Sequence, residues 1–332
     1  MKAYQLQGVG NLQLVNVNYP QLKTGWCVVR VRACGICSSD IPRIYTKGTY
    51  HFPTIPGHEI SGIVDQVFDD EHKDLVGKRV AIFPLVPCKT CEQCLKHAYE
   101  MCANYDYIGS RRDGGFAEYV AVPIWNLVLL PDDISFIQGA EFEPLAVAIH
   151  AIKKSGLTSS DSLAVVGTGM IALSVAMYAS CVMQCESVTV IGRSETKRSL
   201  IEKIGGIEFL SEVPTSRTFS KVIEAVGSNS SISSALSICA PSGTVTLVGN
   251  PEKEITLAQN DYWKILRKQL IVRGSWNSSY PSDWNAVKEA FKCKRFKPEI
   301  FATQVFDAVD LEQGLNLMRK RLASFVRVIT TW

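Results

Sequence analysis

The sequence predicts a mixed α/β protein of two domains, one rich in β-strands and one built on a doubly wound parallel sheet. Three observations lead to this fold class. The chain has 332 residues, which is long for one hydrophobic core and fits two domains of roughly 150 residues each. Residues 1–130 alternate short apolar segments with turn residues. From Ser162 onward, apolar strands are joined to helices through glycine turns.

The composition is that of a globular protein and excludes several classes of function. Hydrophobic residues make up 46% of the chain and charged residues 20%, so disorder is not expected. A membrane-spanning helix would need about 18 consecutive apolar residues, and no such run occurs. The net charge of +3, without a long basic block, argues against nucleic-acid binding. The first residues lack the layout of a signal peptide, which predicts a cytoplasmic protein with reduced cysteines.

The N-terminal part has the pattern of a small antiparallel barrel. In residues 27–33, Val29 and Val31 alternate with arginines, as in a strand with one buried face. Further strands are expected at 59–68, 77–86 and 116–123, each bounded by glycine or proline.

Two helices are expected to follow this β-rich part. Ser135 and Gln138 have the spacing of a capping box, which predicts a helix N-terminus. Pro144 is expected to begin a second helix that ends at Gly156 and links the domains.

The second domain begins with a strand, a helix and a strand at 162–167, 168–180 and 187–192, which is the pattern of a parallel βαβ unit. Later strands at 219–227, 243–250 and 270–276 would complete a doubly wound sheet. The remaining helix-like segments 283–292 and 311–321 and the strand 325–332 are too small to stand alone, so we expect them to return to the first domain. The expected boundaries are 1–148 with 277–332 for the first domain and 149–276 for the second.

A dense group of cysteines predicts a metal site in a lobe at about residues 86–104. Cys88, Cys91, Cys94 and Cys102 are close enough in sequence for one loop to place four thiolates tetrahedrally around an ion. Ferredoxin loops begin with the same spacing, but they continue with three residues, a cysteine and a proline, so zinc is favoured over an iron–sulfur cluster. With four protein ligands the zinc would be structural.

A second, catalytic zinc site is expected from three separate segments. Cys37 and His58 each lie at a turn next to a strand, and Glu143 is a carboxylate in an apolar stretch, where an unpaired charge is costly to bury. A thiolate, an imidazole and a carboxylate would hold Zn²⁺ as a neutral site with a fourth position free for a substrate oxygen.

Neighbouring polar residues are expected to support that site. Glu59 would be a supporting residue or an exchangeable zinc ligand, because a further negative charge on the metal weakens its electrophilicity. Asp40 would accept the free N–H of His58, and Ser39 would pass a proton from the substrate hydroxyl. The alternative for both Ser39 and Asp40 is a helix N-cap.

The glycine-rich turn after the first strand of the second domain predicts a dinucleotide site. Gly167 and Gly169 would let the backbone approach a pyrophosphate at the N-terminus of the next helix. The residues expected to contact the coenzyme at this turn are Gly167, Thr168, Gly169, Met170 and Ile171.

The coenzyme is expected to be NADP(H) rather than NAD(H). Enzymes that use NAD usually place an acidic residue at the end of the second strand, and Gly192 stands there in this chain. The residues that follow offer cationic and hydroxyl donors suited to a 2′-phosphate. These are Arg193, Ser194, Lys197 and Arg198. The alternative is an ordinary charged helix start.

Together these motifs resemble the zinc-containing medium-chain dehydrogenase/reductase family, and the resemblance covers essentially the whole chain. They are CGICSSD at 34–40, PGHEISG at 56–62, the four-cysteine loop, EPLAV at 143–147 and GTGMIA at 167–172. The resemblance implies a GroES-like first domain, a Rossmann second domain and two zinc ions per chain. It also implies Cys37, His58 and Glu143 as catalytic zinc ligands and the four cysteines as structural ligands.

Further segments are similar to the polyol-phosphate dehydrogenases of this family, namely 41–48, 84–96, 105–119 and 263–276. Three positions depart from the family pattern. A histidine that relays protons in many relatives is Pro42, a glycine that follows the GHE motif is Phe68, and the acidic ribose-binding residue is Gly192. These departures concern the proton route, a loop length and the coenzyme, and none removes a metal ligand.

The expected function is the reversible, zinc-dependent oxidation of a secondary hydroxyl of a polyol or polyol phosphate by NAD(P). Arg43, Arg111 and Arg112 are candidate clamps for a substrate phosphate, with solvated surface arginines as the alternative. Two other functions stay open, a dehydrogenase of free polyols or simple alcohols and a non-catalytic protein that kept the fold. Relatives suggest a homodimer or homotetramer.

Overall fold

The computed structural model describes residues 1–320 and 325–332, which form two compact units. The first unit comprises residues 1–143 and 301–332, and the second comprises residues 144–300. No helix among the described residues is both long and apolar enough to cross a membrane. The mixed α/β class with a β-rich first part and a parallel second part is confirmed.

The first unit is organised around the long central strand β3 (Trp26–Ile36). This strand pairs antiparallel with β4 (Glu59–Val67), β8 (Tyr119–Pro123) and β17 (Val328–Thr331). In the described residues these strands belong to a seven-stranded sheet with the order β16-β17-β3-β4-β5-β9, with β8 beside β3. The other two strands of that order are β5 (Arg79–Ile82) and β9 (Leu127–Leu129), and the parallel neighbour of β17 is β16 (Gln304–Asp307).

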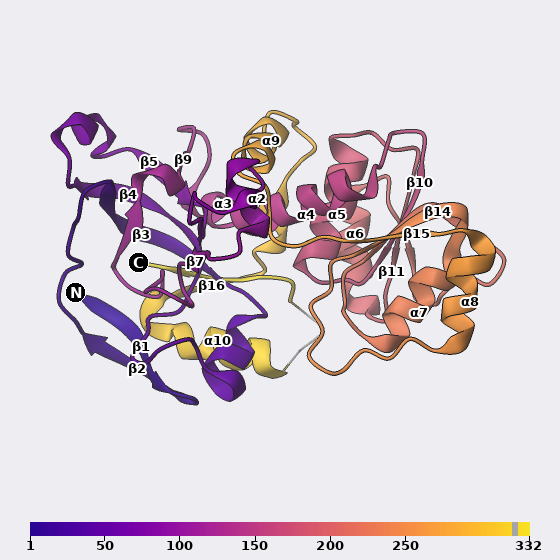
Figure 1. The fold of residues 1–332 in the computed structure, drawn as a ribbon, viewed down its shortest axis with the longest axis horizontal. Helices are drawn as coiled ribbons and strands as arrows, with labels where there is room; N and C mark the ends of the chain where they lie inside the picture. Colours follow the sequence, from indigo (N-terminus) through magenta and orange to yellow (C-terminus); the bar gives the residue numbers. More distant parts are fainter. Residues whose placement is uncertain (321–324) are drawn as a thin grey trace. The chain divides into compact units, whose positions relative to one another are not determined.

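Smaller elements complete this unit. The two-stranded pairs are β1 (Lys2–Gly8) with β2 (Asn11–Asn16) and β6 (Leu85–Val86) with β7 (Asp106–Tyr107). The helices are α1 (Asp40–Pro42), α2 (Glu92–Leu95), α3 (Phe136–Ala140) and α10 (Leu311–Lys320). In Figure 1 the yellow C-terminal segment lies among the indigo and violet strands of the N-terminal part. The chain end therefore completes the sheet that the N-terminus begins.

Local sequence patterns correctly predicted several of these elements. Val29 and Val31 are fully buried, whereas the arginines that alternate with them are exposed. The capping box at the start of α3 is present, because Ser135 Oγ accepts the Gln138 amide and the Gln138 side chain accepts the Ser135 amide. The following helix, α4 (Phe142–Ser155), begins two residues before the expected Pro144. Glu143 therefore lies in the first turn of that helix.

The second unit is a six-stranded parallel sheet with the order β12-β11-β10-β13-β14-β15 in the described residues. Numbered along the chain, this is the order 3-2-1-4-5-6 of a doubly wound dinucleotide-binding sheet. The strands are β10 (Ser162–Val166), β11 (Ser187–Ile191), β12 (Glu208–Leu210), β13 (Phe219–Glu224), β14 (Cys239–Leu247) and β15 (Ile271–Gly274). The helices are α5 (Met170–Cys181), α6 (Arg198–Ile204), α7 (Asn229–Ile238), α8 (Gln259–Lys268) and α9 (Ser282–Ala290). The short strand β12 was not expected from the sequence.

The two compact units differ from the expected domains in residues 144–148 and 277–300. The segment 277–300 groups with the second unit, although it was expected to return to the first. The reason is a buried ionic contact between α9 and α4. Asp283 on α9 is fully buried and lies 2.8 Å from His150 Nδ1 and 2.7 Å from Lys153 Nζ, both on α4. The C-terminal segment 301–332 groups with the first unit, as expected. The expected helical segment 311–321 ends at Arg321, which lies outside the described residues.

Replacing Asp283 by Asn should destabilise the protein at neutral pH. Burial would raise the pKa of Asp283, but hydrogen bonds from His150, Lys153 and the Ser279 amide outweigh it and lower the pKa below its ordinary value. The carboxylate therefore contributes stability above its unfolded pKa of about 3.9, and this contribution is lost as the pH falls through the lower folded value. We expect D283N to lower the free energy of unfolding by about 3 kcal/mol at pH 7.

Urea unfolding of the wild type and D283N between pH 3 and 8 measures this effect. The difference should be constant from pH 5 to 8 and should narrow below about pH 4, where the wild-type carboxylate also becomes neutral. A matched control is E289Q, which removes a carboxylate from the exposed pair of Glu289 with Lys292 on the same helix and should change little. Equal stability of D283N and wild type at pH 7 would contradict the structural role of this contact.

Candidate metal centres and coenzyme site

The four cysteines of the loop at 88–102 converge on one point. Their sulfur atoms all lie within 4.8 Å of one another, and the shortest separation is 3.4 Å between Cys88 and Cys102. The Cys88–Cys94 and Cys91–Cys102 separations are both 3.9 Å. Four sulfur atoms at 2.3 Å from a tetrahedral zinc ion are about 3.8 Å apart, so the cluster fits zinc.

The backbone of this loop also favours thiolates. The amides of Cys91 and Cys88 donate to the sulfur atoms of Cys88 and Cys102, at 3.4 Å and 3.3 Å. Hydrogen bonds from Thr90 and from backbone amides lower the pKa of Cys88 to about 5. The turn itself requires a left-handed residue, and Lys89 adopts it with φ 60°.

A second group of metal-binding side chains forms where β3 ends and β4 begins. The antiparallel register pairs Gly35 with Glu59, so Cys37 lies just beyond the end of one strand and His58 just before the start of the other. Ligand atoms of Cys37, His58 and Glu59 lie within 4.8 Å of one another. His58 and Glu59 are buried, whereas Cys37 is partly exposed. A sulfur, a nitrogen and an oxygen donor in one place suit Zn²⁺.

Glu143, which the sequence placed among the zinc ligands, lies outside this group of three. It is buried in the first turn of α4, and the hydroxyl of Tyr107 donates to its Oε1 at 3.4 Å. Burial and the nearby charge of Glu59 raise the pKa of Glu143 to about 7, although His58 acts in the opposite direction. Glu59 thus lies within the group of three, and Glu143, which the charges of His58 and Glu59 affect, remains the second candidate carboxylate.

Asp40 contacts two of the three candidate metal ligands. Its Oδ2 accepts the amide of Cys37 at 2.9 Å, and its Oδ1 lies 3.4 Å from Nδ1 of His58. This contact leaves Nε2 of His58 available for a metal ion. Burial would raise the pKa of Asp40, but His58 and Arg43 lower it below its ordinary value. The expected support of His58 by Asp40 matches this geometry.

Ser39 and Arg43 form the exposed side of the same network. Arg43 Nη1 donates to Ser39 Oγ at 3.1 Å and to Asp40 Oδ1 at 3.2 Å. Ser39 occupies the N-cap position of α1, but its side chain makes no capping hydrogen bond there. Ser39 Oγ therefore does not cap the helix in the structure.

Sequence reasoning missed Arg327, the residue that holds Glu59. Arg327 directly precedes β17, is 3% exposed, and its Nη2 donates to Glu59 Oε2. A side chain at Gly35 would overlap both of these groups, so only glycine allows the contact. The signal in the sequence was an arginine inside the apolar terminal strand 325–332. A buried charge there requires a partner, but nothing in the sequence identifies Glu59 as that partner.

The three arginines expected to bind a substrate phosphate have different surroundings in the structure. Arg43 lies in the network beside His58, and Arg111 lies between Tyr50 and Tyr105, whose ring centres are 4.2 Å and 4.4 Å from its guanidinium carbon. From Tyr105 a row of edge-on rings continues through Tyr107 to His58, with centroid distances of 6.3 Å and 5.7 Å. Arg111 is therefore connected to the candidate metal centre through aromatic rings.

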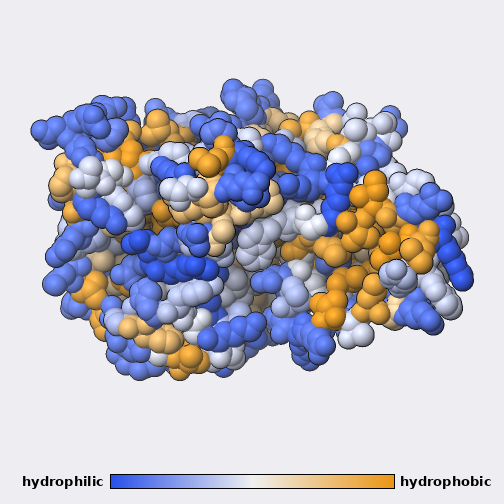
Figure 2. Space-filling model, viewed as in Figure 1, coloured by the Kyte–Doolittle hydropathy of each residue, from blue (hydrophilic) through white to orange (hydrophobic). Residues whose placement is uncertain are grey.

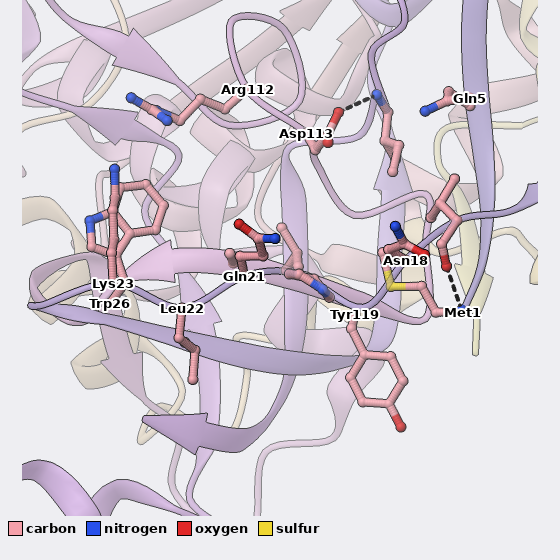
Figure 3. Close-up of a pocket in the computed structure, with 15 residues that line it drawn as sticks. Met1, Gln5, Asn18, Gln21, Leu22, Lys23, Trp26, Arg112, Asp113 and Tyr119 are labelled. Atoms are coloured by element: carbon pink, nitrogen blue, oxygen red, sulfur yellow. Dashed lines mark hydrogen bonds between the residues drawn. The ribbon is translucent and has the colours of Figure 1, made fainter. Parts of the chain in front are cut away.

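Arg112 points into a different region. It forms an ion pair with Asp106 and lies 5.2 Å from the ring centre of Trp26. Trp26 is also contacted by Lys23, at 4.1 Å. Lys23, Trp26 and Arg112 line a cavity of about 550 Å³ (Figure 3). None of the candidate zinc ligands lines it. Arg111 and Arg112 thus do not act on one common ligand.

The glycine-rich turn of the second unit has the properties of a pyrophosphate site. Gly167 adopts φ 128°, which favours glycine, and its amide donates to Ile191 O on the adjacent strand at 2.9 Å. Gly169 is the N-cap of α5 and offers no side chain to bond the first amides of that helix. Thr168 lies between the glycines, and Met170 and Ile171 form the first turn. Free amides at the start of a long helix are suited to bind phosphate.

The side chains after β11 differ in the partners that they contact. Arg193 is exposed, and Ser194 Oγ lies 2.7 Å from Thr196 Oγ1. Arg198, expected to contact the coenzyme, instead pairs with Glu195 at 2.7 Å and stacks on Phe209 at 4.7 Å. Lys197 donates from Nζ to the carbonyl of Thr168 at 2.8 Å. Of the two neighbouring cations, Lys197 therefore faces the phosphate turn.

Two family models match the chain. Residues 23–132 match the alcohol dehydrogenase GroES-like domain, and residues 167–292 match the zinc-binding dehydrogenase domain. Galactitol 1-phosphate 5-dehydrogenase of Escherichia coli K12 is 36% identical over 270 residues, which cover 77% of each chain. Sorbitol dehydrogenase of Bombyx mori is 27% identical over 82% of each chain.

Solved structures show the same arrangement. The crystal structure of galactitol-1-phosphate dehydrogenase from Escherichia coli superposes with a TM-score of 0.91 at 31% identity over the whole of both chains. A zinc-binding dehydrogenase from Sinorhizobium meliloti 1021 bound to NADP has a TM-score of 0.89 at 26% identity, covering 100% of this chain and 99% of that one.

Removing one cysteine of the loop should remove one of two zinc ions. We expect C94S to lose the ion of the four-cysteine cluster while keeping the other, and to unfold at a lower temperature because metal binding contributes to folding. Metal analysis by mass spectrometry and thermal unfolding measure both effects. C293S, which changes a partly exposed cysteine outside the loop, is the control and should keep two ions. Two zinc ions in C94S would contradict a structural zinc at this loop.

Proposed function

We propose, from the fact that this chain belongs to the zinc-type medium-chain alcohol dehydrogenase family, that it oxidises a secondary hydroxyl of a polyol phosphate with NADP⁺. The coarser activity is that of the family, namely a zinc-dependent NAD(P)-linked oxidoreductase acting on CH–OH groups. The observation that carries the proposal is the convergence of Cys37, His58 and Glu59 beside Arg43, with Arg111 connected to them through aromatic rings. The first three can hold the metal, and the two arginines can bind a phosphate.

The metal and the coenzyme would divide the chemistry between them. Cys37, His58 and a carboxylate would hold a zinc ion, which would supply Lewis acidity to the substrate oxygen, and the coenzyme would supply the hydride acceptor. The protein supplies two candidate carboxylates, Glu59 and Glu143, of which Glu59 is already neutralised by Arg327. A cation at the centre would stabilise the ionised form of Glu143, whose pKa burial raises.

The residues of the first unit position the substrate and move its proton. Asp40 orients His58 through Nδ1, and Arg43 donates to Ser39 Oγ, so the hydroxyl of Ser39 keeps its own proton for exchange with the substrate. Ser39 is the proposed proton relay, because Pro42 stands where many relatives have a histidine: its Oγ would accept the substrate proton while it releases its own proton to solvent. This route is compatible with the partly exposed positions of Ser39 and Arg43, which open it to solvent.

Two arginines support a phosphorylated substrate over a free polyol. Arg111 forms no ion pair among the described residues, and its stacking between Tyr50 and Tyr105 holds the guanidinium plane in a fixed orientation. Planar guanidinium groups bind phosphate in a bidentate manner. Arg112 was an equal candidate in the sequence, but it lines the separate cavity, which none of the candidate zinc ligands lines. The proposed clamp is therefore Arg43 with Arg111.

The proposed coenzyme is NADP(H). Gly192 leaves no carboxylate at the end of β11, and Arg193, Ser194 and Lys197 follow it. Among the solved relatives, one from Escherichia coli was crystallised with NADH and one from Sinorhizobium meliloti with NADP, so the fold accepts both coenzymes. The support for NADP(H) is the chemistry of this turn in the chain itself.

A turnover assay that crosses both coenzymes with free and phosphorylated hexitols and pentitols tests the proposed reaction. We expect zinc-dependent reduction of NADP⁺, with kcat/KM at least about tenfold higher for a phosphorylated polyol, because one charge-assisted contact contributes about 1.5–3 kcal/mol. Turnover of free polyols alone would favour the alternative substrate class. No turnover by the zinc-loaded protein with any combination would favour a non-catalytic role.

The variant R111Q tests, in the same assay, whether Arg111 binds the substrate phosphate. It should raise the KM for the phosphorylated polyol and leave the KM for its free form unchanged, because the arginine contacts only the phosphate. R217Q, on an exposed arginine of the second unit, is the charge-matched control. Equal effects of R111Q on both substrates would contradict a phosphate clamp.

We also propose that two copies of the chain associate through the edge of the second sheet. All four residues of β15 are exposed, including Ile271 and Val272, and Trp263 and Leu266 on α8 are exposed as well. Figure 2 shows hydrophobic residues gathered over the region where Figure 1 labels β14 and β15. An exposed, apolar edge strand pairs readily with a second copy of itself about a two-fold axis.

The mass in solution tests this association. We expect a particle of twice 36.6 kDa by light scattering for the wild type, and a shift toward 36.6 kDa for V272K, which places a charge on the edge. V9K, on an exposed valine of the first unit, should keep the larger mass. A wild-type mass of 36.6 kDa would overturn the proposed dimer.

A further inference from the structure

The side chain of His51 connects two loops of the first unit. His51 belongs to the segment 49–54, and its Nε2 lies 3.1 Å from the carbonyl oxygen of Arg111 in the loop 105–113. Its Nδ1 lies 3.1 Å from the carbonyl oxygen of Pro53 in its own segment. Both ring nitrogens therefore face an oxygen that accepts hydrogen bonds and donates none.

The protonated form of His51 fits both contacts. A neutral imidazole has one N–H group, so it can donate to Pro53 or to Arg111 but not to both, whereas an imidazolium donates from both nitrogens. The hydroxyl of Thr54 lies 3.1 Å from Nδ1, but this hydroxyl also donates to the carbonyl of His51 and has only one proton. An imidazolium at His51 satisfies all of these oxygens at once.

The same segment also contacts the side chain of Arg111. Tyr50, the neighbour of His51, has its ring centre 4.2 Å from the guanidinium carbon, and its hydroxyl accepts from Arg111 Nη2 at 3.3 Å. On the other side the ring centre of Tyr105 lies 4.4 Å away, and the Tyr105 carbonyl accepts from Nη1 at 3.1 Å. Two consecutive residues thus hold Arg111, His51 at its backbone and Tyr50 at its guanidinium group.

The segment 49–54 is itself anchored in the first unit. Thr54 is fully buried, its amide donates to the carbonyl of Leu6 in β1 at 3.1 Å, and its carbonyl accepts the Leu6 amide at 2.8 Å. The hydroxyl of Thr49 donates to the carbonyl of His51 at 2.7 Å. These bonds fix the backbone of His51, so its imidazole connects Arg111 to an anchored segment.

His51 is also the group in this region whose charge can change near neutral pH. Its side chain is exposed, so its proton exchanges with solvent. The charged residues on and beside the two loops are Lys47, Asp106, Arg111, Arg112 and Asp113. In β1 the neighbours of Leu6 are the neutral Gln5 and Gln7. Lysine, arginine and aspartate keep their charge between about pH 5.5 and 8.5 and tyrosine stays neutral, whereas histidine titrates in this range.

We propose that His51 is a positioning residue for the substrate clamp, and that its imidazolium form holds Arg111 in the orientation that binds the substrate phosphate. This role rests on the proposed function, in which Arg111 binds that phosphate. Loss of the proton removes one of the two hydrogen bonds of the ring, so the affinity for a phosphorylated polyol should weaken as the pH rises. The affinity for a free polyol should not depend on His51.

Titration calorimetry of the zinc-loaded full chain with a phosphorylated hexitol and with the free hexitol tests this role. We expect H51L to raise the dissociation constant of the phosphorylated hexitol about tenfold at pH 6, and less than about threefold at pH 8.5, where the wild type has also lost its proton. The dissociation constant of the free hexitol should stay the same. Because the substrate phosphate also titrates in this range, each variant is compared with the wild type at the same pH.

Three further variants show how His51 acts. H51Q keeps one donor for the Arg111 carbonyl at every pH, so it should bind the phosphorylated hexitol less tightly than the wild type at pH 6 and about equally at pH 8.5. The double variant H51L/R111Q should bind as R111Q does, because His51 acts through Arg111. The control H72L, on a partly exposed histidine beside Glu71, should match the wild type.

The outcomes separate the role of His51 from the proposed function. If R111Q weakens the binding of the phosphorylated hexitol and H51L does not, only the role of His51 fails. If R111Q binds it as the wild type does, the phosphate clamp fails and the role of His51 with it. A loss in H51L that is the same at both pH values or for both hexitols would also overturn this role. So would a further loss in H51L/R111Q beyond R111Q, or wild-type affinity of H51Q at pH 6, which decides the matter if H51L does not fold.

Discussion

The antiparallel pairing of β3 with β4 is the constraint on which the candidate metal centre depends. The pair of Gly35 with Glu59 places the end of one strand beside the start of the other, and Cys37 and His58 lie directly outside this pair. Because side chains alternate between the two faces of a sheet, a slip of one residue would turn Glu59 away from Cys37. Two irregularities in the register, near Val28 and near Val31, precede this end of the ladder. The chemistry therefore depends on a register that is set along the whole length of β3.

Three of the buried carboxylates of the first unit lie around that pairing and are compensated in different ways. Asp40 has His58 and Arg43 as partners, and Glu59 has Arg327. Glu143 has the hydroxyl of Tyr107, a neutral donor, and its raised pKa reflects this weaker compensation. A divalent cation at the Cys37–His58–Glu59 cluster would add the positive charge that this group of residues lacks. The electrostatics of these residues and the ligand chemistry of zinc thus point to the same location.

In the second unit the candidate coenzyme site instead depends on residues that are close together in the sequence. The glycine-rich turn, the end of β11 and Lys197 are all within about one βαβ unit, and backbone hydrogen bonds connect them. This is why a sequence motif could locate the coenzyme turn, whereas it could not separate Lys197 from Arg198. That distinction depends on which cation Glu195 neutralises, which is a matter of side-chain geometry.

The sequence by itself determined the features that depend on local spacing: the four-cysteine loop, the capping box of α3, the alternation in β3 and the βαβ unit with its glycine turn. Each of these involves residues close together in the chain, where periodicity and chemistry restrict the arrangements. Only the tertiary structure decided the features that depend on distant segments. Arg327 and Glu59 are separated by 268 positions, α9 joins the second unit through Asp283, and the neighbours Arg111 and Arg112 point to different regions. No local pattern encodes these contacts, because they result from strand register and from which buried charges find a partner when the chain packs.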